Sequence, residues 1–357
     1  MASIQLQGDN SGSLTIQAPS DAGNHTLTLP ATTHTLATQN ALGVRNLIIN
    51  GDMRIAQRAT SATGITSSGY YTVDRFQFFE ATDGTYTMTQ DTDVPTGQGF
   101  SNSLKINTTT ADTSITGTQS LRLRHGIEGQ NLQHLKFGTS NAESITLSFW
   151  IKSNLTGDFV SRLLNNSSNR HITSVVTINA ANTWEKKTIT YAGDTTGTFA
   201  NDNTGALFLD IFFAGGPDIT SGAQPTTWQS NSTANQATGT TIDLASSTSN
   251  YVNITGVQLE VGDTATPFEH RPYDMEALRC YRYYWNGDGS HYSSAYSNGA
   301  FLIIDLPTHM RARPTVSYGS TNATGTFTDY SRTNRFQLYD NTDPTYNVVA
   351  PTADAEL

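Results

Sequence analysis

Short segments of alternating apolar and polar residues recur along this chain, and their close spacing constrains its fold more than any other feature. Alternation gives a strand one buried and one exposed face, and strands at intervals of roughly eight to twelve residues are typical of a β-sandwich or jelly roll. We therefore predict an all-β fold whose central strands form two sheets. The predicted central strands are 76–80, 86–89, 104–107, 120–124, 145–151, 175–178, 187–191, 207–213 and 251–259.

Composition supports strands and excludes some functions. Charged residues make up 14% of the 357 positions, against roughly 25% in an average globular protein, and frequent Gly and β-branched residues favour strands joined by tight turns. The net charge of −10 argues against nucleic-acid binding, which needs clustered Lys and Arg. No apolar run is long enough for membrane insertion, and we expect no signal peptide.

Residues 1–45 contain strand signals but few apolar side chains, so they cannot build a core without a partner. The simplest solution is a homotrimeric β stem in which three copies share their apolar faces. A disordered tail is the alternative. The predicted strands of this segment are 4–6, 14–16, 27–29 and 35–37.

Residues 46–272 are assigned to the jelly roll. Within them, 161–169 and 226–241 are rich in Ser, Thr and Asn, and we expect both to be surface loops. Residues 207–213 should turn Leu207, Leu209, Ile211 and Phe213 inward, and 145–151 should do the same with Ile145, Leu147, Phe149 and Ile151.

Residues 273–357 are assigned to a short linking helix and a small C-terminal β domain. Asp274 can cap the helix, and Met275, Leu278, Tyr281 and Trp285 recur at helical spacing, so we expect this stripe to be buried. Cys280, the single cysteine, is expected to be a small core residue. Residues 351–357 are expected to fray. The predicted strands are 301–304, 315–318, 326–327 and 335–339.

The stretch 257–285 reads VQLEVGDTATPFEHRPYDMEALRCYRYYW and resembles a junction in bacteriophage tail fibres and related virion appendages, in which a QLE-V/L-G-x-x-A-T-x-F-E strand precedes an R-Y-Y helix. The resemblance extends to NLIINGDMR at 46–54, TLSFWIKS at 146–153, TWEKKTI at 183–189 and MRARPTV at 310–316. It implies a jelly roll similar to the carbohydrate-binding modules of such fibres. It also implies a virion location after assembly in the host cytoplasm, with residues 1–45 binding other tail proteins.

Standard catalytic and metal motifs are absent from the sequence, so we expect no cofactor and no enzymatic activity. A structural calcium ion would need oxygen ligands such as Asp91 with Asp93, or Asp202 with Asn201 and Asn203, which plain turns explain equally. A glycan hydrolase would need two carboxylates, for which Asp210 with Glu128 or Glu185 are the candidates.

Sugar binding needs an exposed aromatic ring and a few fixed polar groups. On alternation, Trp150, Arg122, Arg124 and Asp210 point away from the core, and we predict that they share one sheet face as a glycan groove, with packing as the alternative. Further candidates are Trp228 in a polar loop and Tyr292 and Tyr296 in a Ser/Gly-rich stretch.

The function predicted from these features is host attachment by a phage tail fibre that binds a cell-surface glycan as its receptor. Two alternatives stay open. The chain would otherwise be a structural virion adaptor or decoration fibre that binds no glycan, or a glycan hydrolase.

Overall fold

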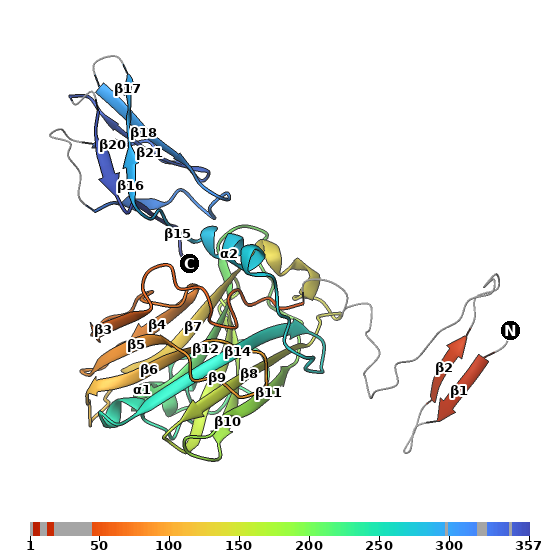
Figure 1. Ribbon diagram of the computed structural model, residues 1–357. Coiled ribbons are helices and arrows are strands. Elements are labelled where there is room, and N and C mark those ends of the chain that lie inside the picture. The colour runs from red at the N-terminus through yellow and green to blue at the C-terminus, as the bar shows by residue number, and fades with distance from the viewer. Residues whose placement is uncertain (1–2, 8–12, 18–44, 297–298, 320–326, 343–344) are drawn as a thin grey trace. The chain divides into compact units, whose positions relative to one another are not determined.

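The structure is a computed structural model that describes residues 3–7, 13–17, 45–296, 299–319, 327–342 and 345–357 (Figure 1). It divides into two compact units, Met1–Leu42 and Gly43–Leu357. In the first unit, β1 (Ser3–Gln7) pairs with β2 (Ser13–Gln17) in an antiparallel hairpin. The predicted strands 4–6 and 14–16 are therefore confirmed, whereas 27–29 and 35–37 lie outside the described residues.

The second unit begins with a sandwich of two six-stranded antiparallel sheets, in which we name the sheets A and B (Figure 1). Every predicted central strand is present. Sheet A has the order β13 (Gln229–Ser230), β10 (Arg170–Ile178), β9 (Gly157–Asn165), β12 (Gly205–Gly215), β7 (Ser120–Glu128) and β4 (Phe76–Glu80). Sheet B has the order β11 (Glu185–Tyr191), β8 (Ile145–Ser153), β14 (Tyr251–Val261), β6 (Ser103–Thr110), β5 (Thr85–Asp91) and β3 (Ser61–Ile65).

The core lies between the two sheets and follows the predicted alternation. Leu209 and Ile211 of β12 and Leu147 and Phe149 of β8 are all at most 1% exposed and belong to one apolar cluster. Strands fill both sides of this cluster with side chains at every second position. The inward assignments made for 145–151 and 207–213 are therefore correct.

The prediction that 161–169 is a surface loop was wrong, because most of this segment belongs to β9 in the middle of sheet A. Polar residues in this strand hide the alternation that would predict it from the sequence. Arg162 is buried and forms an ion pair with Asp210, and the buried Asn165 amide donates to the Thr198 carbonyl at 3.3 Å. Residues 226–241 are largely irregular, as expected, with β13 and the 3-10 turn η4 (Thr233–Asn235) inside them.

Helix α2 spans Tyr273–Tyr281, and only half of the predicted stripe is buried, since Tyr281 packs on the helix contact and Trp285 is 8% exposed. Met275 and Leu278 are 46% and 45% exposed, whereas Ala277 and Cys280 pack against Ile55. The small side chains of Ala277 and Cys280 allow the helix backbone to approach the jelly roll closely. The larger Met275 and Leu278 therefore lie outside the contact. The cap position is held by Pro272 without a side-chain bond, not by Asp274, and Trp285 lies beyond the helix in β15.

The C-terminal region has its own apolar cluster, which includes Trp285, Leu302 and Phe336. Its predicted strands are present, and sheets of two to four strands surround the cluster. The strands are β15 (Tyr284–Asn286), β16 (Ser290–Tyr292), β17 (Ser294–Tyr296), β18 (Gly299–Asp305), β19 (Thr315–Ser317), β20 (Phe327–Asp329), β21 (Arg335–Asp340), β22 (Asn347–Val349) and β23 (Thr352–Asp354).

The expectation that 351–357 would fray was wrong. Strand β23 lies between β15 and β19, and it pairs with both. The Tyr70 hydroxyl of the jelly roll donates to the Leu357 carbonyl at 3.0 Å, so the segment is held beyond the strand as well. In the part of the chain that the structure describes, no helix is long and apolar enough to cross a membrane.

Candidate ligand-binding face

The outer face of sheet A, which points away from the core, carries a row of polar residues that crosses five neighbouring strands. Strand register sets Thr173 opposite Arg162, Arg162 opposite Asp210, Asp210 opposite Arg124, and Arg124 opposite Gln77. Paired residues in antiparallel strands point to the same side of the sheet. These side chains therefore form one continuous line, which we call the polar row.

Aromatic residues lie on both sides of the polar row. On one side, register aligns Phe212 of β12 with Arg122 of β7, and Arg122 with Phe79 of β4. On the other side lies Phe208, which stands opposite Gly126. The face thus alternates cationic and aromatic side chains over three strands.

Three arginines surround one carboxylate at the centre of this face. Arg124 donates to Asp210 from Nε at 2.7 Å and from Nη2 at 3.0 Å, and Arg162 donates from Nη2 at 2.6 Å and Nε at 3.0 Å. The Nε atom of Arg122 lies 3.6 Å from the same carboxylate. One negative charge therefore faces three positive charges, which leaves an excess of two positive charges.

The guanidinium groups also lie over the aromatic rings. The distance from guanidinium carbon to ring centroid is 4.0 Å for Arg122 over Phe79, and 4.6 Å for Arg124 over both Phe79 and Phe208. Such cation–π contacts stabilise by about 0.5–2 kcal/mol each, more where water is excluded. They hold the arginines flat against the sheet.

Burial determines the electrostatics of the face. The side chains of Asp210 and Arg162 are 0% and 2% exposed, and those of Arg122 and Arg124 are 13% and 14% exposed. Desolvation lowers the pKa of Arg122 to about 10. Asp210 raises this pKa, and the positive charges of Arg124 and Arg162 lower it further. Burial alone would raise the pKa of Asp210, but Arg162 and Arg124 outweigh it and hold that pKa well below its usual range.

Several buried polar atoms on this face have no hydrogen-bond partner among the described residues. They are Nε of Arg122 in β7, Nη1 of Arg162 in β9, and Oγ1 of Thr173 and both ring nitrogens of His171 in β10. Desolvation, with Arg162 as a second cause, lowers the pKa of His171 to about 4, so its ring is neutral near pH 7. An unpaired buried polar group costs about 1–3 kcal/mol, and a ligand group that pairs with it recovers that cost.

Two segments border the face. At one end, Ile219 and Ala237, from the connection between β12 and β14, pack on Phe212 and Val160. That connection includes the helical turn α1 (Pro217–Thr220) and η4. At the other end, the side chain of Leu357 lies against Gly126. Between these borders, Arg122, Arg124 and the half-buried Phe79 and Phe208 reach the surface.

The structure brings together three of the predicted site residues, Arg122, Arg124 and Asp210, but not the fourth. Trp150 is in β8 of sheet B, where it stands opposite Lys186 and Thr255. The predicted single groove is therefore wrong in this respect, because alternation fixes which way a side chain points and not which sheet holds it. Arg162 is absent from the predicted site because the sequence predicts a surface loop at 161–169.

The remaining candidates lie elsewhere. Trp228 is half-buried, donates from its indole nitrogen to the Ala192 carbonyl at 2.7 Å, and packs edge-on against Phe137. Tyr292 is 75% exposed in β16 of the C-terminal region. The side chain of Tyr296 lies outside the described residues.

The acidic candidates make ordinary structural contacts. Asp91 and Asp202 accept backbone N–H groups two residues ahead, as in Asx turns, and the described residues contain no cluster of three or more His, Cys, Asp or Glu that could hold a metal. Asp210, Glu128 and Glu185 each bind a different set of donors. The partners of Glu128 are Arg282, Tyr283 and Gln130. Those of Glu185 include Lys187 and the backbone N–H of Ala180.

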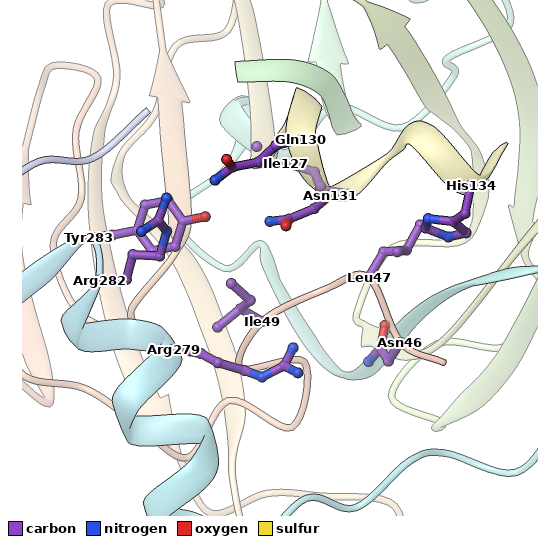
Figure 2. A pocket seen from close by; sticks show the side chains of 11 residues that line it. Asn46, Leu47, Ile49, Ile127, Gln130, Asn131, His134, Arg279, Arg282 and Tyr283 are labelled. Atoms are coloured by element: carbon purple, nitrogen blue, oxygen red, sulfur yellow. The ribbon is translucent and has the colours of Figure 1, made fainter. Parts of the chain in front are cut away.

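A pocket of about 470 Å³ lies where the chain enters the jelly roll, beside α2 (Figure 2). Its lining comes from residues 46–49, the end of β7, the 3-10 turns η2 (Gly129–Asn131) and η3 (Gln133–Leu135), and α2 with the residues that follow it. None of the residues predicted from the sequence as glycan contacts lines it.

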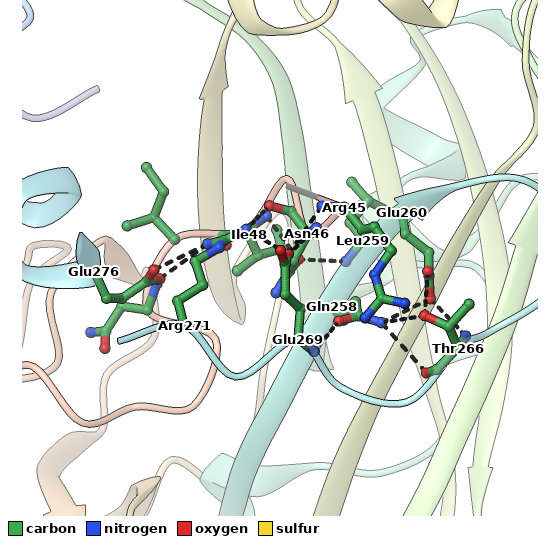
Figure 3. Close-up of polar contacts among 12 residues, drawn as sticks. Arg45, Asn46, Ile48, Gln258, Leu259, Glu260, Thr266, Glu269, Arg271 and Glu276 are labelled. Atoms are coloured by element: carbon green, nitrogen blue, oxygen red, sulfur yellow. Dashed lines mark hydrogen bonds and ion pairs between the residues drawn. The ribbon is translucent and has the colours of Figure 1, made fainter. Parts of the chain in front are cut away.

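The two segments that resemble phage fibre junctions contact each other directly (Figure 3). The buried Asn46 amide donates to the Val257 carbonyl at 3.0 Å and accepts the Leu259 N–H at 3.0 Å, so it fastens the entering chain to β14. Arg271 then donates to Glu276 at 3.1 Å and to the Ile48 carbonyl at 3.2 Å. We call these contacts the junction network.

Glycine is required at one point of this junction. A Cβ atom on Gly51 would lie 2.1 Å from the Val257 carbonyl oxygen, and the Gly51 carbonyl accepts the Val257 N–H at 2.9 Å. Only a residue without a side chain permits this approach. The motifs that are most recognisable in the sequence therefore have a structural role, and they lie apart from the polar row.

No protein-family model matches the chain, and no curated protein matches it in sequence. Among solved structures, it is similar to the enzymatically active domain of bacteriophage CBA120 tailspike protein 4, with 12% identity and a TM-score of 0.31 over 60% of this chain and 21% of that chain. It is also similar to a family 11 carbohydrate-binding module from Clostridium thermocellum, with 11% identity and a TM-score of 0.29 over 58% of this chain and 98% of that one. A third likeness is to the CBM22-1 xylan-binding domain of Paenibacillus barcinonensis Xyn10C, with 12% identity and a TM-score of 0.26 over 57% and 95% of the two chains. TM-scores of this size carry no argument about ligand or partner.

Proposed function

We propose that this chain is a bacteriophage tail fibre protein that attaches the virion to its host by binding an anionic surface glycan on the outer face of sheet A. One observation carries the glycan part of the proposal. Three arginines share a single carboxylate on that face, between half-buried phenylalanine rings.

The charge of the polar row favours an acidic ligand over a neutral one. Excess positive charge in a partly desolvated position is unfavourable, and a carboxylate, phosphate or sulfate group that binds there relieves it. Arginine suits this task because its planar group pairs with such anions through two hydrogen bonds. The rings of Phe79 and Phe208 offer apolar surface to the faces of neighbouring sugar rings.

The virion part of the proposal is supported by the residues of the junction, whose order resembles that of phage appendages. In this proposal, residues 1–45 form the stem of a homotrimer and bind other tail proteins. Three faces on each fibre raise the apparent affinity by roughly 10² to 10⁴ over one face, provided that one glycan array spans them.

Binding of polygalacturonate, an acidic polysaccharide, tests the proposal against dextran, a neutral one. Arg122→Gln is the informative variant because Arg122 makes the longest of the three contacts with Asp210, so its loss disturbs the fold least. We expect polygalacturonate to bind, dextran not to bind, and the variant to bind at least about tenfold more weakly, as for loss of a charged hydrogen bond. Isothermal titration at two salt concentrations measures this, and binding should weaken as salt rises.

Lys186→Gln is the matched control, since it removes one exposed positive charge beside Trp150 on the outer face of sheet B. Its affinity should equal that of the unaltered chain. Equal loss in both variants would indicate diffuse charge attraction. Absence of polysaccharide binding would favour a structural virion adaptor, and release of reducing ends would favour a glycan hydrolase.

A further inference from the structure

The pocket beside α2 contains an arginine, Arg279, that no hydrogen bond or ion pair with a described residue holds in place. Arg279 projects from α2 along the pocket wall (Figure 2). Its neighbour Arg282 differs, because Nε and Nη2 of Arg282 both donate to Glu128 at 2.7 Å. The Arg282–Glu128 pair is neutral as a unit. Glu276 and Glu269 lie near enough to act on Arg279 electrostatically, but both pair with Arg271, so the guanidinium N–H groups of Arg279 stay available to a ligand.

Other polar groups that face this pocket are also available. The side chains of Asn131 and His134 form no hydrogen bond with a described residue, and both line the same pocket. Desolvation lowers the pKa of His134, so near pH 7 its ring is neutral and adds no charge. The pocket therefore offers one cation and two neutral groups that can donate or accept hydrogen bonds.

Apolar side chains line the pocket as well. Leu47 and Ile49, from the entering chain, line it together with Ile127 at the end of β7. A volume of about 470 Å³ lies within the roughly 300–1,000 Å³ typical of small-molecule sites. The matching ligand carries a single negative charge, several hydroxyl groups and one apolar face.

From this arrangement we infer that the pocket beside α2 is a second binding site, for a small monocarboxylate of the uronic acid class, with Arg279 as the carboxylate partner. The site differs from the polar row, with which it shares none of the arginines. It does not require that the polar row bind a glycan.

The experiment compares D-glucuronate with D-glucose, which have the same ring and differ in the carboxylate. The readout is local, namely the imidazole ¹H–¹³C signal of His134 in the full chain, assigned with His134→Gln. We expect D-glucuronate to shift this signal saturably and D-glucose to leave it unchanged. Arg279→Gln should abolish the shift. It removes no hydrogen bond or ion pair with a described residue, so the variant should fold as the unaltered chain does.

Arg122→Gln separates this inference from the proposed function. It should leave the D-glucuronate shift of His134 unchanged, even though it weakens polygalacturonate binding at the polar row. Three results would overturn the second site. They are an unmoved His134 signal, an equal response to both sugars, and a D-glucuronate response that persists in Arg279→Gln.

Discussion

Arg75 and Glu356 form an ion pair that joins the jelly roll to the segment following β23, 281 residues later in the chain. Arg75 is fully buried, donates to the Gly126 carbonyl at 2.7 Å, and lies 3.4 Å from the ring centroid of Tyr283. Glu356 also lies 3.4 Å from Arg58. A charge at this depth needs its partner, so the pair couples the stability of the two regions.

Glu356→Ala should therefore destabilise the chain by about 3–5 kcal/mol, because it leaves the Arg75 charge buried and unpaired. Urea unfolding followed by tryptophan fluorescence measures the change. Asp305→Ala is the control, since Asp305 pairs with Arg335 at the surface and should contribute less than about 1 kcal/mol. Equal stabilities of the two variants would contradict the coupling.

Asn46→Ala should destabilise the jelly roll by at least about 2 kcal/mol. The substitution leaves the Val257 carbonyl and the Leu259 N–H buried without their partner, at about 1–3 kcal/mol for each group. Asn201→Ala, at an exposed position, should lie within about 0.5 kcal/mol of the unaltered chain. Thermal unfolding of both variants gives their free energies of unfolding. If Asn46→Ala loses as little stability as the control, the junction network does not stabilise the jelly roll.

Asp74 should make stability depend on pH. Burial raises its pKa to about 7 in spite of hydrogen bonds from Gln57, so between pH 4 and 7 the folded chain keeps a proton that the unfolded chain has released. Its contribution is fully present below about pH 4 and is lost as pH rises through about 7, at up to about 1.4 kcal/mol per pH unit. Asp74→Asn should flatten this slope in urea unfolding at a series of pH values. The exposed Asp288→Asn should keep the slope of the unaltered chain.

Cys280 should be unreactive in the folded chain. It is fully buried, and burial raises its thiol pKa well above the usual value, so little thiolate forms and reagents cannot reach it. Mass spectrometry should find no iodoacetamide adduct on the folded chain and one adduct after urea unfolding. Ser114→Cys, at an exposed position, should label without urea. Rapid native labelling at Cys280 would show that α2 separates readily from the jelly roll.

The homotrimer can be tested by light scattering of the full chain and of a chain that starts at Asn46. We expect three chain masses for the first and a smaller assembly for the second, because residues 1–45 lack a core of their own. A trimer in both would move the assembly contacts into the later regions. A monomer in both would exclude the trimeric stem.

Alternation in the sequence predicts most strands of the jelly roll and which of their side chains enter the core, but it does not predict β3, β9 or β13. It failed at β9, where the polar residues Ser161, Arg162 and Asn165 are buried in the middle of sheet A. It also failed at α2, where close approach selected Ala277 and Cys280 over Met275 and Leu278. Residue pattern does not reveal such pairing between distant segments.

The candidate face shows the same limit. Arg122, Arg124 and Asp210 could be assigned to the outer side of their strands, but only the order of strands in sheet A brings them together and separates them from Trp150. Arg162 completes the polar row from a strand that was not predicted. No sequence pattern distinguishes Arg279, because it stands out only through its place in the pocket and its lack of a hydrogen bond or ion pair with a described residue.

The position of β14 has a consequence for synthesis in the cell. In sheet B this strand lies between β8 and β6, although it is made last of the six, and Tyr251 follows Ser153 of β8 by 98 residues. At about 5–20 residues per second, a nascent chain waits roughly 5–20 s on the ribosome with the edges of β6 and β8 unpaired. Open edges of this kind recruit strands from other chains. Nascent chains on neighbouring ribosomes of one messenger RNA therefore expose these edges close to one another, and we expect chaperones that cover them in this interval to reduce aggregation.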